Sequence, residues 1–201
     1  MGKMNLLKAD YAGKVGQTVG AKWKNQSTIR TYTKPSNPNT DAQQTVRNGF
    51  KAINAFVALF ADQIRYKSAL DVSGMSVRNA IVKLNSEMVS TNTFTKANLI
   101  ISKGGLQKVN GEAGTAASGV VTITWNEPTA TNFTEEAKLV AVLVQEDSGM
   151  VEVLEAAADA GTVTGSLTFA EGTVDAYVYF LDKRGSNKIA SLSDYIAITV
   201  A

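Results

Sequence analysis

Basic and aromatic residues alternate near the N-terminus, and they are the residues of this 201-residue chain best suited to recognising a partner. They are Lys14, Lys22, Trp23, Lys24, Arg30 and Tyr32. Single-stranded nucleic acid is bound by this combination, because bases stack on aromatic rings while cations follow the phosphates. A protein partner is the alternative, with Trp23 as an apolar anchor and the aliphatic stems of the lysines lying beside it. We favour the protein partner.

Catalytic chemistry lacks its usual side chains. The chain contains no cysteine and no histidine, the residues that supply most transition-metal sites and nucleophile–base pairs. The glycine-rich stretch GKVGQTVGAKWKN at residues 13–25 lacks the spacing and the strand-to-helix context of a phosphate-binding loop. We therefore expect no cofactor, no metal site and no enzymatic activity.

Two pairs of carboxylates follow later in the chain: Glu135 with Glu136, and Glu152 with Glu155. On strands or loops such pairs are ordinarily solvated, so we assign them no acid–base role. The Asp-Ser-Gly sequence at residues 147–149 is typical of a hairpin turn rather than of a calcium-binding loop.

A short β-ribbon must position the basic and aromatic residues. Apolar residues along residues 11–33 can line one side of two short strands: Val15, Val19, Trp23, Ile29 and Tyr32. The sequence KNQS, residues 24–27, is the predicted turn between them. A two-stranded ribbon is only marginally stable alone. It must therefore lie against the protein's own helices or against a neighbouring subunit.

The connector KPSNPNTDAQ, residues 34–43, leads from this ribbon into a helix. Pro35 and Pro38 favour extended backbone, and Thr40 can cap the helix with Gln43 as the other half of a capping box. Residues 1–39 are therefore predicted to form a basic, extended arm that docks on a neighbouring subunit.

Two helices are predicted to follow the arm. Apolar residues recur at helical spacing over residues 41–66: Val46, Phe50, Ile53, Phe56, Val57, Phe60 and Ile64. A second helix is predicted over residues 76–88, capped by Ser73 or Ser76. Gly49 indicates close packing within the first helix. Residues 40–94 are thus predicted to form a helical hairpin with Phe50, Phe56 and Phe60 in its interior.

Seven β-rich runs separated by turn residues occupy residues 95–201, from ANLIISKG to SDYIAITVA. Such spacing predicts an antiparallel β-sandwich. Alternation places Val121, Ile123 and Trp125 on one face of their strand. It also places Tyr177 and Tyr179 on the face opposite to that of the residues next to them in the chain. A tryptophan on an early strand and a late tyrosine are similar to immunoglobulin- and fibronectin-like sandwiches. The predicted class is therefore α+β: a β-ribbon arm and helical hairpin, followed by this sandwich.

Charge is distributed unevenly along the chain. Residues 1–83 contain 13 Lys and Arg against 4 Asp and Glu, whereas residues 84–201 contain 7 against 14. A basic segment can face nucleic acid, a membrane or an acidic protein, or the two parts can attract each other. The N-terminal sequence lacks the apolar run of a signal peptide, and no stretch reaches membrane-spanning length. We expect a soluble protein that is not secreted through a signal peptide and does not bind a membrane.

Several motifs resemble an uncharacterised family of unknown function that is common in Bacteroidota genomes and their phages. They are GKVGQTVGAKWK with IRTYTKPSNPNTDAQQTVRNGF, then LIISKG, and then AYVYFLDKRGSNKIASLSDYIA near the C-terminus. The resemblance spans most of the chain, and its most specific element is Asn37–Pro38 followed by Thr40, Ala42–Gln43, Arg47 and Phe50. It implies a non-enzymatic protein and carries over no catalytic residue. Related N-terminal patterns in predicted phage virion proteins imply a virion role.

Two classes of function are compatible with these features. The first is a structural protein of a bacteriophage or phage-like particle, such as a capsid decoration or head-fibre subunit. It would be assembled in the host cytoplasm in several copies and would contact capsid or other virion subunits. The second is a cellular binding module, either associated with nucleic acid or acting in surface adhesion. We favour the virion protein.

Overall fold

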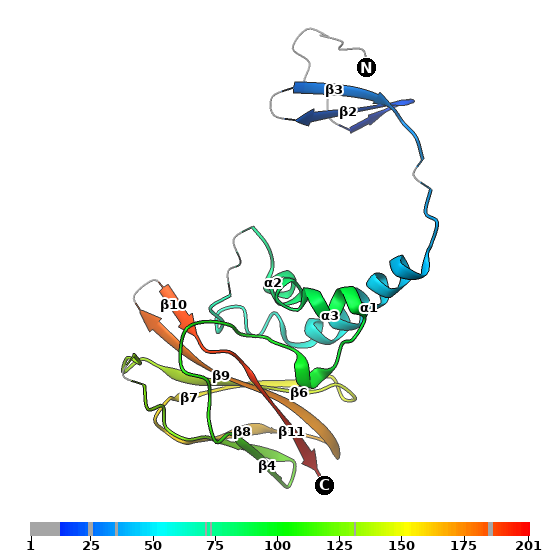
Figure 1. The fold of residues 1–201 in the computed structure, drawn as a ribbon. Coiled ribbons are helices and arrows are strands. Elements are labelled where there is room, and N and C mark those ends of the chain that lie inside the picture. The colour runs from blue at the N-terminus through cyan, green and yellow to red at the C-terminus, as the bar shows by residue number, and fades with distance from the viewer. Residues whose placement is uncertain are drawn as a thin grey trace. The chain divides into compact units, whose positions relative to one another are not determined.

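The computed structural model describes residues 13–23, 26–34, 36–70, 72, 74–130, 132–184 and 187–201, and gives only the backbone of Val15, Trp23 and Gln26. The predicted positions Lys24, Pro35 and Ser73 lie outside the described residues. The chain forms two compact units, one ending at Thr40 and one comprising Asp41–Ala201 (Figure 1). The predicted boundary near residue 94 falls inside the second unit.

The first unit contains a three-stranded antiparallel sheet, called the ribbon here, with the strands in chain order: β1 (Gly13–Val15), β2 (Thr18–Trp23) and β3 (Gln26–Thr31). Trp23 pairs with Gln26, so this hairpin turns where the sequence predicts. The prediction of two strands is wrong, because a third strand forms before β2. Gly16 has a φ of 60°, a left-handed conformation that glycine adopts without strain and that reverses the chain between β1 and β2.

The second unit begins with helices, whose bounds are α1 (Asp41–Phe60), α2 (Val77–Leu84), α3 (Ser86–Thr91) and the 3-10 helix η1 (Lys96–Asn98). The first helix starts at the predicted residue but is shorter than predicted, since turns replace it from Ala61 onward. Ser76 caps α2, as predicted, by accepting a hydrogen bond from the backbone N of Asn79 at 3.2 Å.

The predicted second helix is broken at Asn85. Its side-chain amide donates to the carbonyl oxygens of Ile81 at 2.8 Å and Ile100 at 2.7 Å, and accepts from the backbone N of Ile100 at 2.9 Å. These bonds hold the later segment against the helix end, with Asn85 itself outside helical geometry at φ −106° and ψ 27°. A buried amide with three such partners competes with the helical ladder.

Two antiparallel sheets complete the second unit. The five-stranded sheet contains β6 (Lys138–Gln145), β7 (Met150–Ala157), β9 (Gly172–Arg184), β10 (Asn187–Ala190) and β11 (Asp194–Val200). Its order is β10-β9-β6-β7, and β11 pairs with the same edge of β9 as β10. The three-stranded sheet has the order β4 (Ala113–Ala117), β5 (Val120–Thr124) and β8 (Thr162–Thr168).

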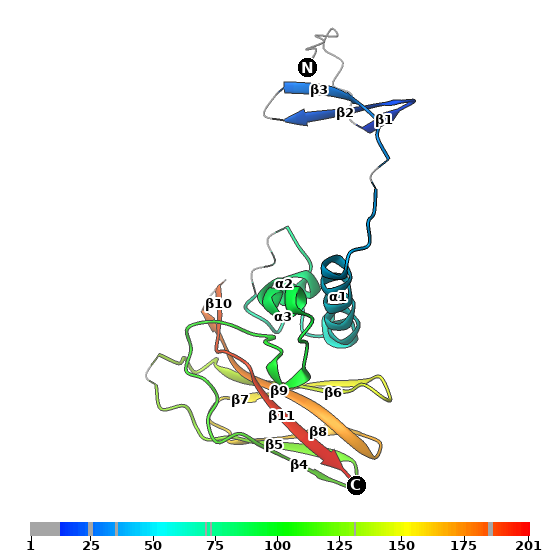
Figure 2. The same ribbon diagram turned by 45° about the vertical axis from the view of Figure 1, so that its right-hand side comes forward.

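The five-stranded sheet is buried on both faces. Figures 1 and 2 show the helices along one face and the three-stranded sheet along the other. On the helix side, Tyr177 and Tyr179 of β9 share a core with Phe56 and Phe60. On the other side, a second core joins the alternate residues of β6 and β9 to β5 and Trp125. The predicted alternations and the mixed class with mostly antiparallel strands are therefore confirmed.

Two predictions for this unit are wrong. The run ANLIISKG is η1 followed by irregular backbone, because side chains rather than a strand satisfy its amides: the backbone N of Ile101 donates to Ser193 Oγ at 3.0 Å. Val46 and Phe50 are not interior, since their exposed fractions are 44% and 51%. Among the first ten residues of α1, Gly49 is buried, Thr45 is half-buried and the others are exposed.

Gly49 explains how the helices pack so closely. A Cβ atom added there would lie 2.3 Å from the carbonyl oxygen of Val89 in α3 and 3.2 Å from the Cα of Asn92. Only a residue without a side chain permits this approach of α1 to α3. The close packing that the sequence indicates at Gly49 is confirmed.

Candidate functional site

The ribbon brings three of the six predicted binding residues onto one face. Lys14 pairs with Val19, and Val19 with Arg30, so these side chains share a face. Tyr32 extends the ladder through its backbone N, which donates to the carbonyl oxygen of Gln17 at 2.7 Å. The Lys14 ammonium lies 3.7 Å from the centroid of the Tyr32 ring, a cation–π contact.

The other three predicted residues are placed differently or not at all. Lys22 pairs with Ser27. Because Lys22 is three residues after Val19 on the same strand, its side chain lies on the face opposite to that of Lys14, together with Ile29. Trp23 occupies the end of β2, but its side chain lies outside the described part of the structure, as does Lys24. The six residues therefore do not form one continuous patch.

Few of the ribbon side chains that the structure describes are buried. Gly20 is the one buried residue among those described up to Thr40, and Ile29 and Tyr32 are 39% and 41% exposed. Residues 11–40 contain five Lys and Arg and no Asp or Glu. The ribbon is thus a basic, open sheet with apolar side chains on its surface.

A second group of charges lies where η1 meets the five-stranded sheet. Lys96 Nζ is 3.0 Å from Oδ2 of the buried Asp175 and 2.8 Å from Glu146 Oε2. The Tyr195 hydroxyl donates to Asp175 Oδ1 at 2.7 Å, and the Tyr177 hydroxyl donates to the carbonyl oxygen of Lys96 at 2.9 Å. These contacts fasten η1 to β9 and β11.

The protonation of this group follows from its partners. Burial lowers the pKa of Lys96, but the hydrogen bonds and charges of Glu146 and Asp175 outweigh burial and raise that pKa overall. Burial and then the hydrogen bond to Asp175 raise the pKa of the Tyr195 phenol to about 12. The lysine is therefore charged and the phenol neutral near pH 7, and the one ammonium is shared between Asp175 and Glu146. Residues so distant in sequence give no local signal by which this group could be predicted.

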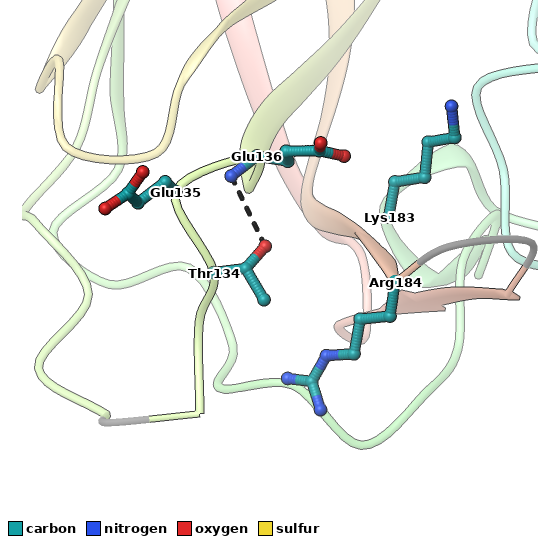
Figure 3. Close-up of a pocket in the computed structure, with 5 residues that line it drawn as sticks. All are labelled: Thr134, Glu135, Glu136, Lys183 and Arg184. Atoms are coloured by element: carbon teal, nitrogen blue, oxygen red, sulfur yellow. Dashed lines mark hydrogen bonds between the residues drawn. The ribbon is translucent and has the colours of Figure 1, made fainter.

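An open hollow of about 620 Å³ lies at the other end of the sheet. It is lined by Thr134, Glu135, Glu136, Lys183 and Arg184, which Figure 3 shows. The Glu135 carboxylate and the Lys183 ammonium point away from each other in that view. The charged groups do not converge on a common point, as acid–base catalysis would require.

Asp182 underlies this hollow and holds its loop in place. The buried carboxylate accepts hydrogen bonds from the Thr134 hydroxyl, from the Thr134 backbone N at 3.3 Å and from Arg184 Nε at 3.0 Å. Burial raises the pKa of Asp182, but these hydrogen bonds outweigh it and lower that pKa overall. The arrangement fixes a loop conformation.

Glu152 and Glu155 do not act together. Glu152 is buried and accepts from the backbone N and the hydroxyl of Ser166, each at 2.6 Å, which joins β7 to β8. Glu155 forms ion pairs with Lys67 at 3.0 Å and Lys138 at 3.1 Å. Residues three apart on a strand face opposite sides, which separates the two carboxylates.

The β6–β7 connection is a hairpin turn, as predicted for residues 147–149. The backbone N of Gly149 donates to the carbonyl oxygen of Glu146 at 3.1 Å, and Gly149 has a φ of 67°. Within the residues that the structure describes, no group of three or more Asp and Glu side chains is arranged to hold a metal ion.

A family described as a family of unknown function, DUF6266, matches residues 10–197. The chain belongs to this family. Its resemblance to an uncharacterised family is thereby confirmed. The DUF6266 match covers the ribbon, the helices and both sheets, so these parts occur together as one family architecture. No curated protein matches the sequence.

Solved structures similar to this DUF6266 chain are distant. One is the rat CD45 extracellular region, domains d3-d4, with 17% identity, a TM-score of 0.37, and coverage of 49% of this chain and 52% of that one. Another is a family 76 glycoside hydrolase from a bovine Bacteroides thetaiotaomicron strain, with 14% identity and a TM-score of 0.37, covering 47% of this chain and 20% of that one. The chain thus spans about half the length of the first and a fifth of the second.

No helix among the described residues combines the length and the apolar character needed to cross a membrane.

Proposed function

We infer that this protein is a non-enzymatic structural subunit of a bacteriophage or phage-like particle, of the capsid decoration or head-fibre type. Its basic N-terminal region would dock on other virion subunits, and it would be assembled in the host cytoplasm. One observation carries the proposal: the ribbon is conspicuously basic, and only Gly20 is buried among the residues described up to Thr40. A small sheet without a core needs a partner to be stable.

The connector supports a docking role for the ribbon. Pro38 restricts its own φ and favours extended backbone at Asn37, so less conformational entropy is lost when this part of the connector is held in one conformation in an assembly. The segment 36–40 has no helix or strand, and α1 begins directly after it at Asp41.

The second unit supports a role as a stable projecting body. We propose that its two sheets form an immunoglobulin- or fibronectin-like sandwich. In support, Trp125 lies in the core between the sheets, and its Nε1 donates to the carbonyl oxygen of Ala158 at 2.8 Å. Sandwiches of this kind recur as compact modules in many proteins of unrelated sequence.

A second candidate is a cellular module that binds single-stranded nucleic acid. The observation that favours it is the stacking of Lys14 on Tyr32, with Arg30 on the same face. One aromatic ring beside two cations is a small platform compared with the series of rings that tracks successive bases. We rank this candidate below the virion protein for that reason.

Particles purified from the source test the proposal. Mass spectrometry should find the protein in stoichiometric amounts in the particles, and its absence would refute a virion role. Deleting residues 1–33 should abolish incorporation while leaving the second unit folded, whereas a charge reversal on the body, Lys83→Glu, should not affect incorporation. Trp23→Ala should weaken incorporation with little change in melting temperature. Incorporation of the deletion variant at the wild-type level would show that the ribbon is not the docking element.

The nucleic-acid candidate makes the opposite prediction for the same variants. The deletion variant would still assemble, and salt-sensitive binding to single-stranded oligonucleotides would be lost instead.

A further inference from the structure

We propose that the ribbon docks on the acidic unit Asp41–Ala201 of a second copy of this chain, so that copies associate head to tail. The proposal rests on the docking role given above to the ribbon, and it names the partner. It is carried by the face formed by Lys14, Arg30 and Tyr32, by the exposure of nearly all the ribbon side chains that the structure describes, and by the opposite charges of the two units.

Charge selects the partner. Residues 11–40 contain five Lys and Arg and no carboxylate, whereas residues 41–201 contain 13 Lys and Arg against 17 Asp and Glu. Opposite charges on two surfaces steer their encounter and fix the orientation of the complex. The acidic unit of another copy is present at the same concentration as the ribbon wherever the protein is made.

Charge also excludes the symmetric alternative. If two ribbons packed against each other, their lysines and arginines would meet without any carboxylate from residues 11–40. Juxtaposed like charges are costly in an interface. The contact is therefore heterologous, with different surfaces on the two copies, and each copy offers both a ribbon and an acceptor.

The ribbon also needs the apolar cover that a second copy provides. Ile29 and Tyr32 are on the surface with exposed fractions of 39% and 41%, and Val19 is only half-buried. Burying such side chains gives an interface its net favourable free energy, with charged residues around them adding specificity. Both ribbon faces carry a cation and an apolar side chain: Arg30 pairs with Val19 on one face, and Lys22 shares the other face with Ile29.

Sedimentation of the nuclease-treated, full-length protein tests this contact. Oligomers should form in a concentration-dependent way at low salt. They should dissociate when ionic strength rises from about 0.05 M to about 0.5 M, which shortens the Debye length about threefold. The double variant Lys14→Glu/Arg30→Glu should weaken association by at least about tenfold. The matched variant Lys83→Glu/Lys103→Glu, with the same change in net charge on the second unit, should associate at least as tightly as wild type.

A variant lacking residues 1–33 distinguishes head-to-tail docking from ribbon pairing. It should not associate with itself, but it should bind full-length protein and shorten the oligomers, because it retains an acceptor. Failure to bind full-length protein would overturn the proposal, as would a full-length protein that stays monomeric at every salt concentration. A monomer that binds only a single-stranded oligonucleotide would overturn it in favour of nucleic acid.

The two proposals can fail separately. Protein that is abundant in particles yet monomeric when purified refutes head-to-tail docking and leaves the virion role intact. Oligomers from a protein that is absent from particles refute the virion role alone.

Discussion

Replacing Phe60 by alanine should lower the stability of the helices and of both sheets by the same amount. The Phe60 side chain is fully buried, its ring centroid lies 5.8 Å from that of Phe56, and it stacks at 6.2 Å on Tyr177 of the five-stranded sheet. Truncating a buried phenylalanine costs about 3–5 kcal/mol. In a unit of this size each kcal/mol lowers the melting temperature by about 2–4 °C, so the expected loss is roughly 6–20 °C.

Phe50→Ala is the matched control. Phe50 lies on the same helix, but 51% of it is exposed. Its truncation removes little buried surface and should change stability by no more than about 0.5 kcal/mol. Both variants replace phenylalanine by alanine on the same helix, so a difference between their stability losses reports burial and not helix propensity.

Two probes report on opposite sides of the five-stranded sheet. Far-ultraviolet circular dichroism follows the helices, and the fluorescence of Trp125 follows the core between the sheets. The chain has two tryptophans, so a Trp23→Phe background makes Trp125 the single reporter. Because the helices and the five-stranded sheet share one core, Phe60→Ala should shift both transitions equally.

Different outcomes would refute different steps of this reasoning. If Phe60→Ala melted the helices early and left the Trp125 transition in place, residues 40–94 and 95–201 would be separate domains, as the sequence predicts. If Phe50→Ala were as costly as Phe60→Ala, the exposed face of α1 would be wrongly assigned.

Three further perturbations test individual contacts. Gly49→Ala should destabilise the protein to urea, although alanine favours helices, because its Cβ would meet the Val89 carbonyl oxygen; a higher urea midpoint would contradict the close helix contact. Glu152→Ala should cost about 1–3 kcal/mol, since backbone N–H groups of β8 lose their acceptor; an unchanged urea midpoint would count against it. The pKa of Tyr195 is about 12 in the folded protein against 10.0 for a free phenol. The contribution of the neutral Tyr195 phenol to folding stability is therefore complete below about pH 10 and is lost as the pH rises through 12. Melting curves of Tyr195→Phe should show a shallower loss over that range than wild type, and identical slopes would exclude the assigned role.

The sequence predicts the strand faces of the second unit well, because alternation is a local property. Tyr177 and Tyr179 are correctly separated from Val178 and Phe180 by period alone. What alternation does not reveal is the identity of the layer that each face meets. Seven of the eight residues of β6 are buried, and a strand without a polar face is the local sign that something covers both sides.

The errors share a different cause, which is dependence on distant residues. Val46 and Phe50 continue the helical apolar period of Ile53 and Phe60, but no sequence period shows where the covered part of α1 ends. The ribbon face could be predicted only in part. Its third strand depends on the left-handed conformation of Gly16, and that conformation leaves no signal in the spacing of the apolar residues.

The shared core also means that α1 packs against a strand, β9, that is synthesised much later. The Tyr179 hydroxyl donates to the carbonyl oxygen of Lys67, 112 residues earlier in the chain. At roughly 5–20 residues per second, the ribosome needs roughly 6–22 s to supply β9 after the end of α1. Throughout that interval the core that α1 shares with β6 and β9 is incomplete, and nascent chains that expose apolar side chains are natural substrates for chaperones. Ribosome-bound chains truncated before β9 should therefore be protease-sensitive in α1, and chains extended through β11 should be protected.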